Sequence, residues 1–201
     1  MALKKIPLLQ SLQSLLGALF ASLPFSATQM TLSSVLFAAI GFYFSFQHQP
    51  LLSLLFFVIA GAVDAIDGAV ARAKKQVTAQ GAFIDGMTDR LVEFLFVLSF
   101  LFYPLPSFML PAFLWLVIFL FFGSCMTGFV TAYADHRKVA GKQKLESQPG
   151  ILPRAERLIL LFAALAFVPI YPISTSFILA CAAVLSFVTF MQRFWYFAKS
   201  D

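Results

Sequence analysis

The chain has 201 residues, of which 61% are hydrophobic and 11% are charged, and its mean hydropathy is +0.90. A soluble globular domain carries about 25% charged residues, so the composition excludes one. The apolar runs are long and continuous, which excludes a transmembrane β-barrel. They predict an all-α integral membrane protein whose single domain fills residues 1–201.

The predicted elements begin with an amphipathic helix at residues 6–23, where leucines recur at helical spacing with glutamines and serines between them. A helix of this kind lies in the plane of the membrane interface. Six transmembrane helices are expected to follow, each near the length of about 20 residues that a bilayer requires. Their predicted bounds are 30–47, 51–74, 81–103, 108–134, 152–170 and 174–196.

In this arrangement, all 14 lysine and arginine residues fall on one side of the membrane. The connections on the opposite side, at 47–50, 104–107 and 170–174, contain none. By the positive-inside rule the basic side is cytoplasmic, so both termini are expected there, in a multi-pass protein of the cell membrane. Basic loops facing anionic lipid account for the net charge of +5, and no nucleic-acid partner is expected.

Four of the 9 acidic residues fall between positions 64 and 89, at the cytoplasmic ends of the second and third spans. Carboxylates beside long apolar runs are costly and are usually functional. Asp64 and Asp67 are three residues apart, and Asp85 and Asp89 are four apart, so each pair occupies one face of its helix. The connection between these spans is short, which makes them antiparallel neighbours. The two pairs are therefore expected to face each other at similar depth.

Four carboxylates in one low-dielectric cluster must be protonated, paired with cations or bound to metal ions. Oxygen ligands of this kind suit Mg²⁺, Mn²⁺ or Ca²⁺, and two such ions would balance four negative charges. Gly68 and Gly81 carry no side chain beside the cluster, so a ligand can approach the backbone closely. Carboxylate-bound Mg²⁺ usually completes its shell with substrate phosphates. The sequence therefore predicts a site for a phosphate or diphosphate that enters from the cytoplasm.

The pattern Asp-x-x-Asp-Gly-x-x-Ala-Arg-x8-Gly-x-x-x-Asp-x-x-x-Asp is complete from Asp64 to Asp89. It resembles the signature of the CDP-alcohol phosphotransferases, which make phospholipid head groups. The resemblance implies an interfacial N-terminal helix, six transmembrane helices and a homodimer. It also implies a metal-dependent enzyme that transfers a phosphatidyl or archaetidyl group from a CDP-linked lipid to an alcohol hydroxyl, with release of CMP.

Motif position carries the roles of the family onto this chain. The implied metal ligands are Asp64, Asp67, Asp85 and Asp89. The residues implied to line the CDP site are Gly68, Ala71, Arg72 and Gly81. Asp89 would also be the general base on the acceptor hydroxyl, and Arg72 would contact the diphosphate. The expected cofactor is a pair of Mg²⁺ or Mn²⁺ ions.

Many family members also carry a Pro-Asn-x-x-Thr element before the first span, and the corresponding stretch here is 27–31. Its final residue, Thr31, matches, whereas the proline and the asparagine are absent. Thr31 and Thr28 are the candidates to contact the nucleotide, and Gln29 could replace Thr28 in this role. The alternative is that Thr28 or Thr31 caps the N-terminus of the first membrane helix.

A second polar concentration, between residues 133 and 157, resembles the loop of family members that use a phosphorylated acceptor. A phosphate on the acceptor requires cations nearby. The candidates are Arg137, Arg154 and Arg157, with Arg193 from the last span and Lys138 or Lys142 in reserve. The alternative for each is an ordinary basic residue of a cytoplasmic loop. Inositol phosphate is the expected acceptor, and glycerol 3-phosphate is the alternative.

Glu93 extends the helix face of Asp85 and Asp89 by one further turn. It could reach the site or pair with Arg90 beside it. A structural role in such a pair is the favoured interpretation.

Two other functions fit parts of the sequence. A cation or proton transporter would use intramembrane carboxylates, but it would place them near the midplane and often shows inverted repeats. This chain has no visible repeat, and its carboxylates group toward one surface. A structural protein that pairs aspartates with arginines would leave four acids in one window unexplained.

Overall fold

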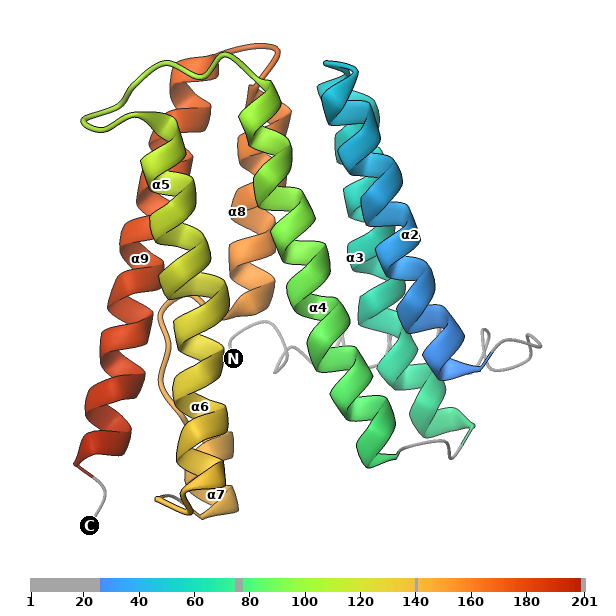
Figure 1. Cartoon of the computed structure of the whole chain (residues 1–201), viewed down its shortest axis with the longest axis vertical. Helices are drawn as coiled ribbons and strands as arrows, with labels where there is room; N and C mark the ends of the chain where they lie inside the picture. Colours follow the sequence, from blue (N-terminus) through green and yellow to red (C-terminus); the bar gives the residue numbers. More distant parts are fainter. Residues whose placement is uncertain (1–25, 75–77, 140, 200–201) are drawn as a thin grey trace. The chain divides into compact units, whose positions relative to one another are not determined.

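The computed structural model describes residues 26–74, 78–139 and 141–199, and Figure 1 shows its helices. Within these residues there is no β-strand, only an isolated bridge between Phe108 and Leu110, so the prediction of an all-α chain is confirmed. The predicted interfacial helix at 6–23 lies outside the described residues. The chain forms two compact units, Met1–Tyr103 and Pro104–Asp201, which are described in turn.

The first unit contains three long helices, α2 (Ala27–Phe46), α3 (Pro50–Ala73) and α4 (Ala79–Ser99). A 3-10 turn, η2 (Phe100–Phe102), extends the end of α4. Figure 1 shows α2 and α3 side by side, and α2 packs along both α3 and α4. The backbones of α3 and α4 come close to each other at far fewer places. Helix α2 is therefore the element that joins the other two.

Each helix of the first unit begins at a residue suited to a helix N-terminus. Ser26 caps α2, because its Oγ accepts from the Gln29 amide at 3.2 Å while the Gln29 side chain accepts from the Ser26 amide at 2.8 Å. Pro50 occupies the first turn of α3, where no amide hydrogen is needed. The Thr78 hydroxyl caps α4 by accepting from the Gly81 amide at 2.9 Å.

Aromatic stacking and a buried hydroxyl cluster join the helices of the first unit. The rings of Phe57 and Phe96 stack at a centroid distance of 4.2 Å and an interplanar angle of 12°. The Tyr103 hydroxyl donates to Ser45 Oγ at 3.0 Å, and Ser45 Oγ lies 2.6 Å from Ser53 Oγ. All five side chains are buried, so the polar ones satisfy one another inside the unit.

The second unit is arranged around α9 (Pro172–Ala198), which packs against α8 (Arg154–Phe167) and a long helical rod. The rod consists of α5 (Ala112–Ile118), a π-helical segment η3 (Phe119–Met126) and α6 (Thr127–His136). A short helix, α7 (Lys142–Glu146), follows α6 in the chain (Figure 1).

Gly123 lies in the π-helical segment, where the rod meets α9. A Cβ atom at this position would lie 2.8 Å from Ser186 Oγ and 3.4 Å from Arg157 Cδ. The first of these distances is shorter than a real contact, so only glycine permits this approach of the helices. The Thr127 hydroxyl donates to the Gly123 carbonyl, which gives that oxygen a side-chain partner within the π-helical turn.

Residues 147–152 are held against one face of α9 by side-chain hydrogen bonds. The Leu152 amide donates to Thr189 Oγ1 at 3.0 Å, and the Ile151 amide donates to Gln192 Oε1 at 3.1 Å. These bonds satisfy backbone donors in a segment outside the long helices. They fix the segment that leads directly into α8.

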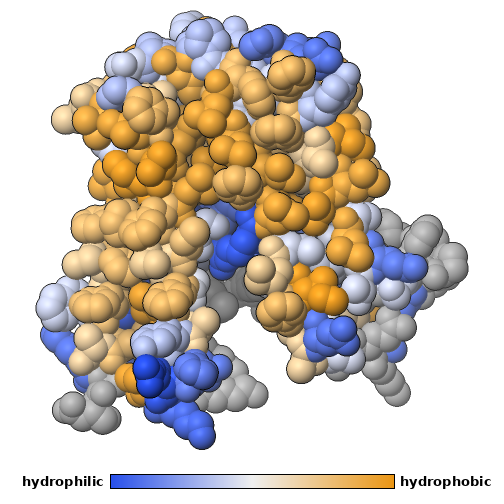
Figure 2. Space-filling model, in the orientation of Figure 1, coloured by the Kyte–Doolittle hydropathy of each residue, from blue (hydrophilic) through white to orange (hydrophobic). Residues whose placement is uncertain are grey.

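Four helices in the described part of the chain are long and apolar enough to cross a membrane: α2, α3, the rod from α5 to α6, and α9. Figure 2 shows that the visible helix surfaces are largely hydrophobic, with hydrophilic residues gathered near the helix ends. Helices α4 and α8 are not among these four, because α4 carries four charged residues and α8 has only 14 residues. At about 1.5 Å per residue, α8 is shorter than a hydrocarbon core of about 30 Å. The chain is a membrane protein.

Gly41 permits α2 to approach α3, because a Cβ there would lie 3.1 Å from the Phe57 ring and 3.2 Å from the Ser53 carbonyl. Gly41→Leu is expected to lower the free energy of unfolding by about 1–3 kcal/mol through overpacking. Thermal unfolding in detergent measures this loss. Ala39→Leu, at an exposed position of the same helix, is the control and should change the unfolding temperature little. Equal effects of the two substitutions would contradict close packing at Gly41.

Candidate active site

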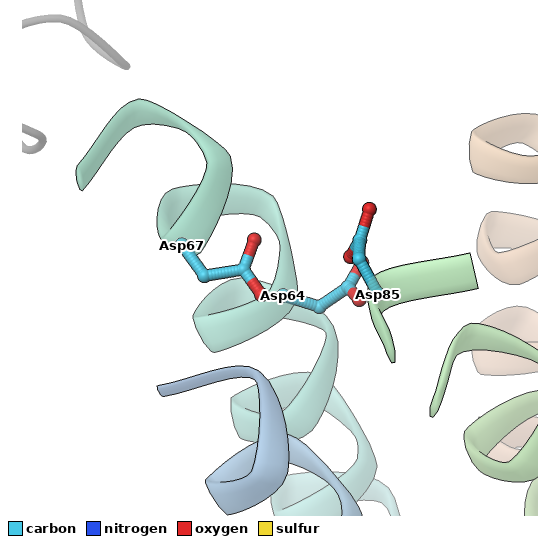
Figure 3. A group of neighbouring side chains, drawn as sticks. All are labelled: Asp64, Asp67 and Asp85. Carbon is cyan, nitrogen blue, oxygen red and sulfur yellow. The ribbon is translucent and has the colours of Figure 1, made fainter. Parts of the chain in front are cut away.

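Three carboxylates converge in the first unit. Asp64 and Asp67 come from α3 and Asp85 comes from α4, and each places one oxygen within 4.8 Å of the other two (Figure 3). Asp64 is partly buried and Asp67 is 4% exposed. The helical spacing of Asp64 and Asp67 and the short connection from α3 to α4 bring these groups together, as the sequence indicates.

The fourth aspartate of the motif, Asp89, is not a member of this three-carboxylate group. It lies one helical turn beyond Asp85 on α4, and it is partly buried. The structure thus brings three of the four predicted ligands together, rather than two facing pairs. Asp85 of α4 joins both acids of α3, whereas Asp89 of the same helix is outside the group.

The three carboxylates fit a divalent cation. Mg²⁺ and Ca²⁺ bind oxygen ligands at about 2.0–2.6 Å, so oxygens that share one ion lie at most about 4–5 Å apart. The oxygens of Asp64, Asp67 and Asp85 meet this limit. Three carboxylates at this separation repel one another in a site of low dielectric, and a bound cation removes that repulsion.

A cavity of about 250 Å³ opens beside the carboxylates, between the start of α2, the end of α3 and the start of α4. Its lining residues are Thr28, Thr31, Asp67, Gly68, Ala71, Arg72, Thr78, Gly81, Ala82 and Asp85. All six residues predicted for the CDP site are among them. Thr78 and Ala82 were not predicted, because both fall at positions that the motif leaves open. The capping pattern Thr78-x-x-Gly81 is the one signal that could have indicated Thr78.

Two glycines and an arginine shape this cavity. A Cβ at Gly81 would lie 3.1 Å from Thr78 Oγ1, so a side chain there would crowd the cap and the cavity together. A Cβ at Gly68 would lie 3.6 Å from Arg72 Nη1, which places the guanidinium beside Gly68. Arg72 and two of the clustered aspartates, Asp67 and Asp85, therefore line the same cavity, an arrangement suited to a phosphate group carried with a metal ion.

The N-terminal part of α2 contributes two hydroxyls to the cavity, from Thr28 and Thr31. The Thr31 hydroxyl donates to Asp67 Oδ2 at 2.6 Å, a buried contact that sequence reasoning missed. The alternative that Thr28 or Thr31 caps this helix is wrong, because Ser26 is the N-cap. The Gln29 side chain belongs to the same capping box, which engages its carbonyl oxygen at the helix start.

Glu93 is fully buried in α4, and its Oε2 accepts from Arg90 Nη1 at 3.2 Å. This pair agrees with the structural role favoured from the sequence. A buried carboxylate is costly without such a partner.

The candidate acceptor cations lie in the second unit, and two of them are built into its packing. Arg157 of α8 is 2% exposed, and its Cδ lies near Gly123. Arg193 of α9 donates from Nη1 to the Thr127 carbonyl at 3.0 Å and from Nε to the Pro149 carbonyl at 3.3 Å. Arg193 therefore links α9, α6 and the segment before α8.

The remaining acceptor candidates lie nearer the surface or at helix ends. Arg137 is exposed, donates to the Tyr133 hydroxyl at 3.0 Å and lies over the Tyr133 ring, 5.2 Å from its centroid. Lys138 is exposed with a φ of 55° just after α6. Lys142 is the first residue of α7, and Arg154 is the first residue of α8.

Comparison with known proteins relates this chain to a family of membrane enzymes. The family model for CDP-alcohol phosphatidyltransferase matches residues 25–197. The archaetidylinositol phosphate synthase of Pyrococcus horikoshii is 29% identical over 183 residues, which cover 89% of this chain and 86% of that protein. The archaetidylinositol phosphate synthase of Aeropyrum pernix is 30% identical over 151 residues, which cover 75% of this chain and 71% of that protein.

Solved structures with the same fold come from Mycobacterium tuberculosis phosphatidylinositol phosphate synthase. The structure with CDP-DAG bound superimposes with a TM-score of 0.78 at 18% identity and covers 94% of both chains. The complex of that enzyme with manganese and citrate gives a TM-score of 0.77 at 20% identity, covering 94% of this chain and 90% of that one. These likenesses establish the fold.

Asp85→Asn is expected to weaken Mn²⁺ binding by at least about 10-fold, since replacing a charged ligand by a neutral amide costs no less than losing an outer-shell partner. Free Mn²⁺ measured by electron paramagnetic resonance in a detergent titration gives the affinity. Asp135→Asn, an exposed acid on α6, is the matched control and should bind as the unchanged protein does. A three-carboxylate metal site would be ruled out by equal affinities of the Asp85 variant and the unchanged protein.

Proposed function

Because the chain belongs to the CDP-alcohol phosphatidyltransferase family, we propose that it transfers the lipid-phosphate group of a CDP-linked lipid to a hydroxyl of an inositol phosphate. The observation that carries the proposal is the cavity in the first unit. It joins Asp67 and Asp85 of the carboxylate group with Arg72 and the two motif glycines in one space. A diphosphate held by a metal ion requires this combination of charge and open backbone.

The metal ligands proposed are Asp64, Asp67 and Asp85, with Asp89 completing the set for a second ion. Two divalent ions, Mg²⁺ or Mn²⁺, would neutralise the diphosphate and polarise its phosphorus–oxygen bonds. Support for metal use comes from the oxygen spacing of the three carboxylates. The number of ions follows from the charge of four aspartates.

The protein's own residues bind and orient the donor. Arg72 contacts the diphosphate from its place beside Gly68. Ala71 has a small side chain and Gly81 has none, so the CDP group lies close to the backbones of α3 and α4. Thr28 offers a hydroxyl to the nucleotide at the opposite wall. Binding of this kind fixes the reacting phosphate before the acceptor arrives.

Asp89 is proposed as the general base. Its carboxylate accepts the proton of the acceptor hydroxyl while the hydroxyl oxygen forms a bond to the β-phosphorus of the donor. The bond from that phosphorus to the CMP oxygen breaks, and CMP carries the electron pair away. The position of Asp89 outside the group of Asp64, Asp67 and Asp85 favours a role distinct from theirs.

The acceptor proposed is an inositol phosphate. Two relatives that match most of this chain and most of their own length are archaetidylinositol phosphate synthases, which supports this acceptor over glycerol 3-phosphate. The donor is accordingly an archaetidyl or phosphatidyl CDP-lipid. The cations proposed for the acceptor phosphate are Arg137, Arg154, Arg157 and Arg193, with Lys138 and Lys142. Arg154 is favoured among them. Arg157 is buried beside Gly123, Arg193 binds backbone carbonyls, and Arg137 lies over the Tyr133 ring.

The proposed topology has an interfacial helix and six membrane helices, with both termini and the active site on the cytoplasmic side of the cell membrane. The six helices are α2, α3, α4, the rod from α5 to α6, α8 and α9. The one-sided distribution of lysine and arginine supports this orientation. A homodimer is proposed from the family resemblance.

The reaction predicts release of CMP from a CDP-lipid when Mg²⁺ or Mn²⁺ and inositol phosphate are both present. A panel of inositol phosphate, glycerol 3-phosphate, serine and free inositol, assayed by CMP formation in detergent, identifies the acceptor. We expect CMP formation to be fastest with inositol phosphate. Faster turnover with glycerol 3-phosphate would replace the acceptor assignment, and absence of CMP with every acceptor would refute the proposed reaction.

Asp89→Asn is expected to abolish turnover while preserving most of the affinity for the CDP-lipid, since it removes the proton acceptor. Single-turnover CMP release and equilibrium binding of the donor measure the two effects separately. Asp67→Asn is the comparison, and it should weaken donor binding strongly. If both variants lose donor affinity equally, Asp89 acts chiefly as a ligand.

A further inference from the structure

We propose that Thr31 is a positioning residue for the metal site, acting through Asp67 rather than on the nucleotide. The inference rests on the proposed function, because it assigns Asp67 as a metal ligand. It concerns a contact between two helices, α2 and α3, that joins Asp67 of the motif to a residue outside the stretch from Asp64 to Asp89. Its basis is the hydrogen bond from Thr31 Oγ1 to Asp67 Oδ2 at 2.6 Å.

Both partners of this bond are removed from solvent. Thr31 is 5% exposed and Asp67 is 4% exposed, so water does not compete for the contact. A hydrogen bond to an ionised carboxylate is short and about twice as strong as one between neutral groups. The terminal torsion of an aspartate is broad, so a carboxylate without such a partner can rotate. The Thr31 hydroxyl therefore fixes the orientation of the Asp67 carboxylate.

Fixing one oxygen still leaves the carboxylate able to bind a cation. An ionised carboxylate offers about four lone-pair sites, and the Thr31 proton occupies one of them. The Asp67 carboxylate also belongs to the group with Asp64 and Asp85, so it can accept from Thr31 of α2 and bind the proposed ion at the same time. Partners that orient metal ligands in this way tune metal affinity by about 10–100-fold.

The hydroxyl of Thr31 has a single proton. Because that proton is directed to Asp67, Thr31 can offer only lone pairs to a ligand in the cavity. A phosphate or ribose oxygen that accepts hydrogen bonds gains nothing from it. Thr28, which lines the same cavity, is the better candidate to donate to the nucleotide.

The start of α2 is built to hold Thr31 in place. The capping box of Ser26 and Gln29 fixes the first turn of the helix. In the following turn, the buried Ser34 hydroxyl donates to the Thr31 carbonyl at 2.7 Å. The position of Thr31 relative to Asp67 is thus set by α2 itself and by its packing along α3.

The test is Mn²⁺ binding without nucleotide or lipid substrate, measured by electron paramagnetic resonance on the full chain in detergent. Thr31→Val removes the hydroxyl and keeps the side-chain shape, and it should weaken Mn²⁺ affinity about 10-fold or more. Thr31→Ser restores the hydroxyl and should bring the affinity back to within about threefold. Ser45→Ala, which removes a buried hydroxyl near the other end of the same helix, should leave Mn²⁺ affinity unchanged.

The outcomes separate this inference from the proposed function. If the unchanged protein binds Mn²⁺ and Thr31→Val binds it equally well, the positioning role is overturned while the metal site stands. If the unchanged protein binds no Mn²⁺, the metal-dependent function and the inference both fail. Should Thr31→Val not fold, Thr31→Cys replaces it, because a thiol is a weaker donor of similar size. Unaltered Mn²⁺ affinity in Thr31→Cys would then overturn the positioning role.

Discussion

Electrostatic repulsion among carboxylates is the constraint on which the first unit depends. Asp64, Asp67 and Asp85 converge within 4.8 Å beside apolar helices, an arrangement that costs free energy unless positive charge compensates it. Three neighbouring features lower this free-energy cost or allow positive charge to compensate it. The Thr31 hydroxyl donates to one carboxylate, the Arg72 guanidinium lies at the same cavity, and the oxygen spacing fits a divalent ion.

The fold meets this constraint with three helices that have separate tasks. Helix α3 supplies two acids, the motif glycine Gly68 and Arg72, while α4 supplies the third acid and begins at a capped glycine turn. Helix α2 packs along both and contributes hydroxyls. The described residues that line the cavity therefore all fall between Thr28 and Asp85. In the second unit, Gly123 and the bonds of Arg193 organise the packing of α9.

Features that depend on the spacing of nearby residues could be predicted from the sequence. Continuous apolar runs indicate the long helices, and the positions of Asp64, Asp67 and Asp85 on helix faces indicate a cluster. Features that depend on how two helices pack against each other could not be predicted. The bond from Thr31 to Asp67 joins residues 36 apart, and Asp89 lies outside the group that Asp85 joins from the same helix. Residue types alone do not specify how these helices pack against each other.

The proposed function requires that the three carboxylates bind a cation that also contacts the diphosphate of the donor. Phosphorus-31 electron–nuclear double resonance of the Mn²⁺-loaded protein with bound CDP-diacylglycerol tests it most directly. We expect a strong phosphorus hyperfine coupling, because a phosphate oxygen would bind the ion. Mn²⁺ bound at saturating donor without any phosphorus coupling would contradict it.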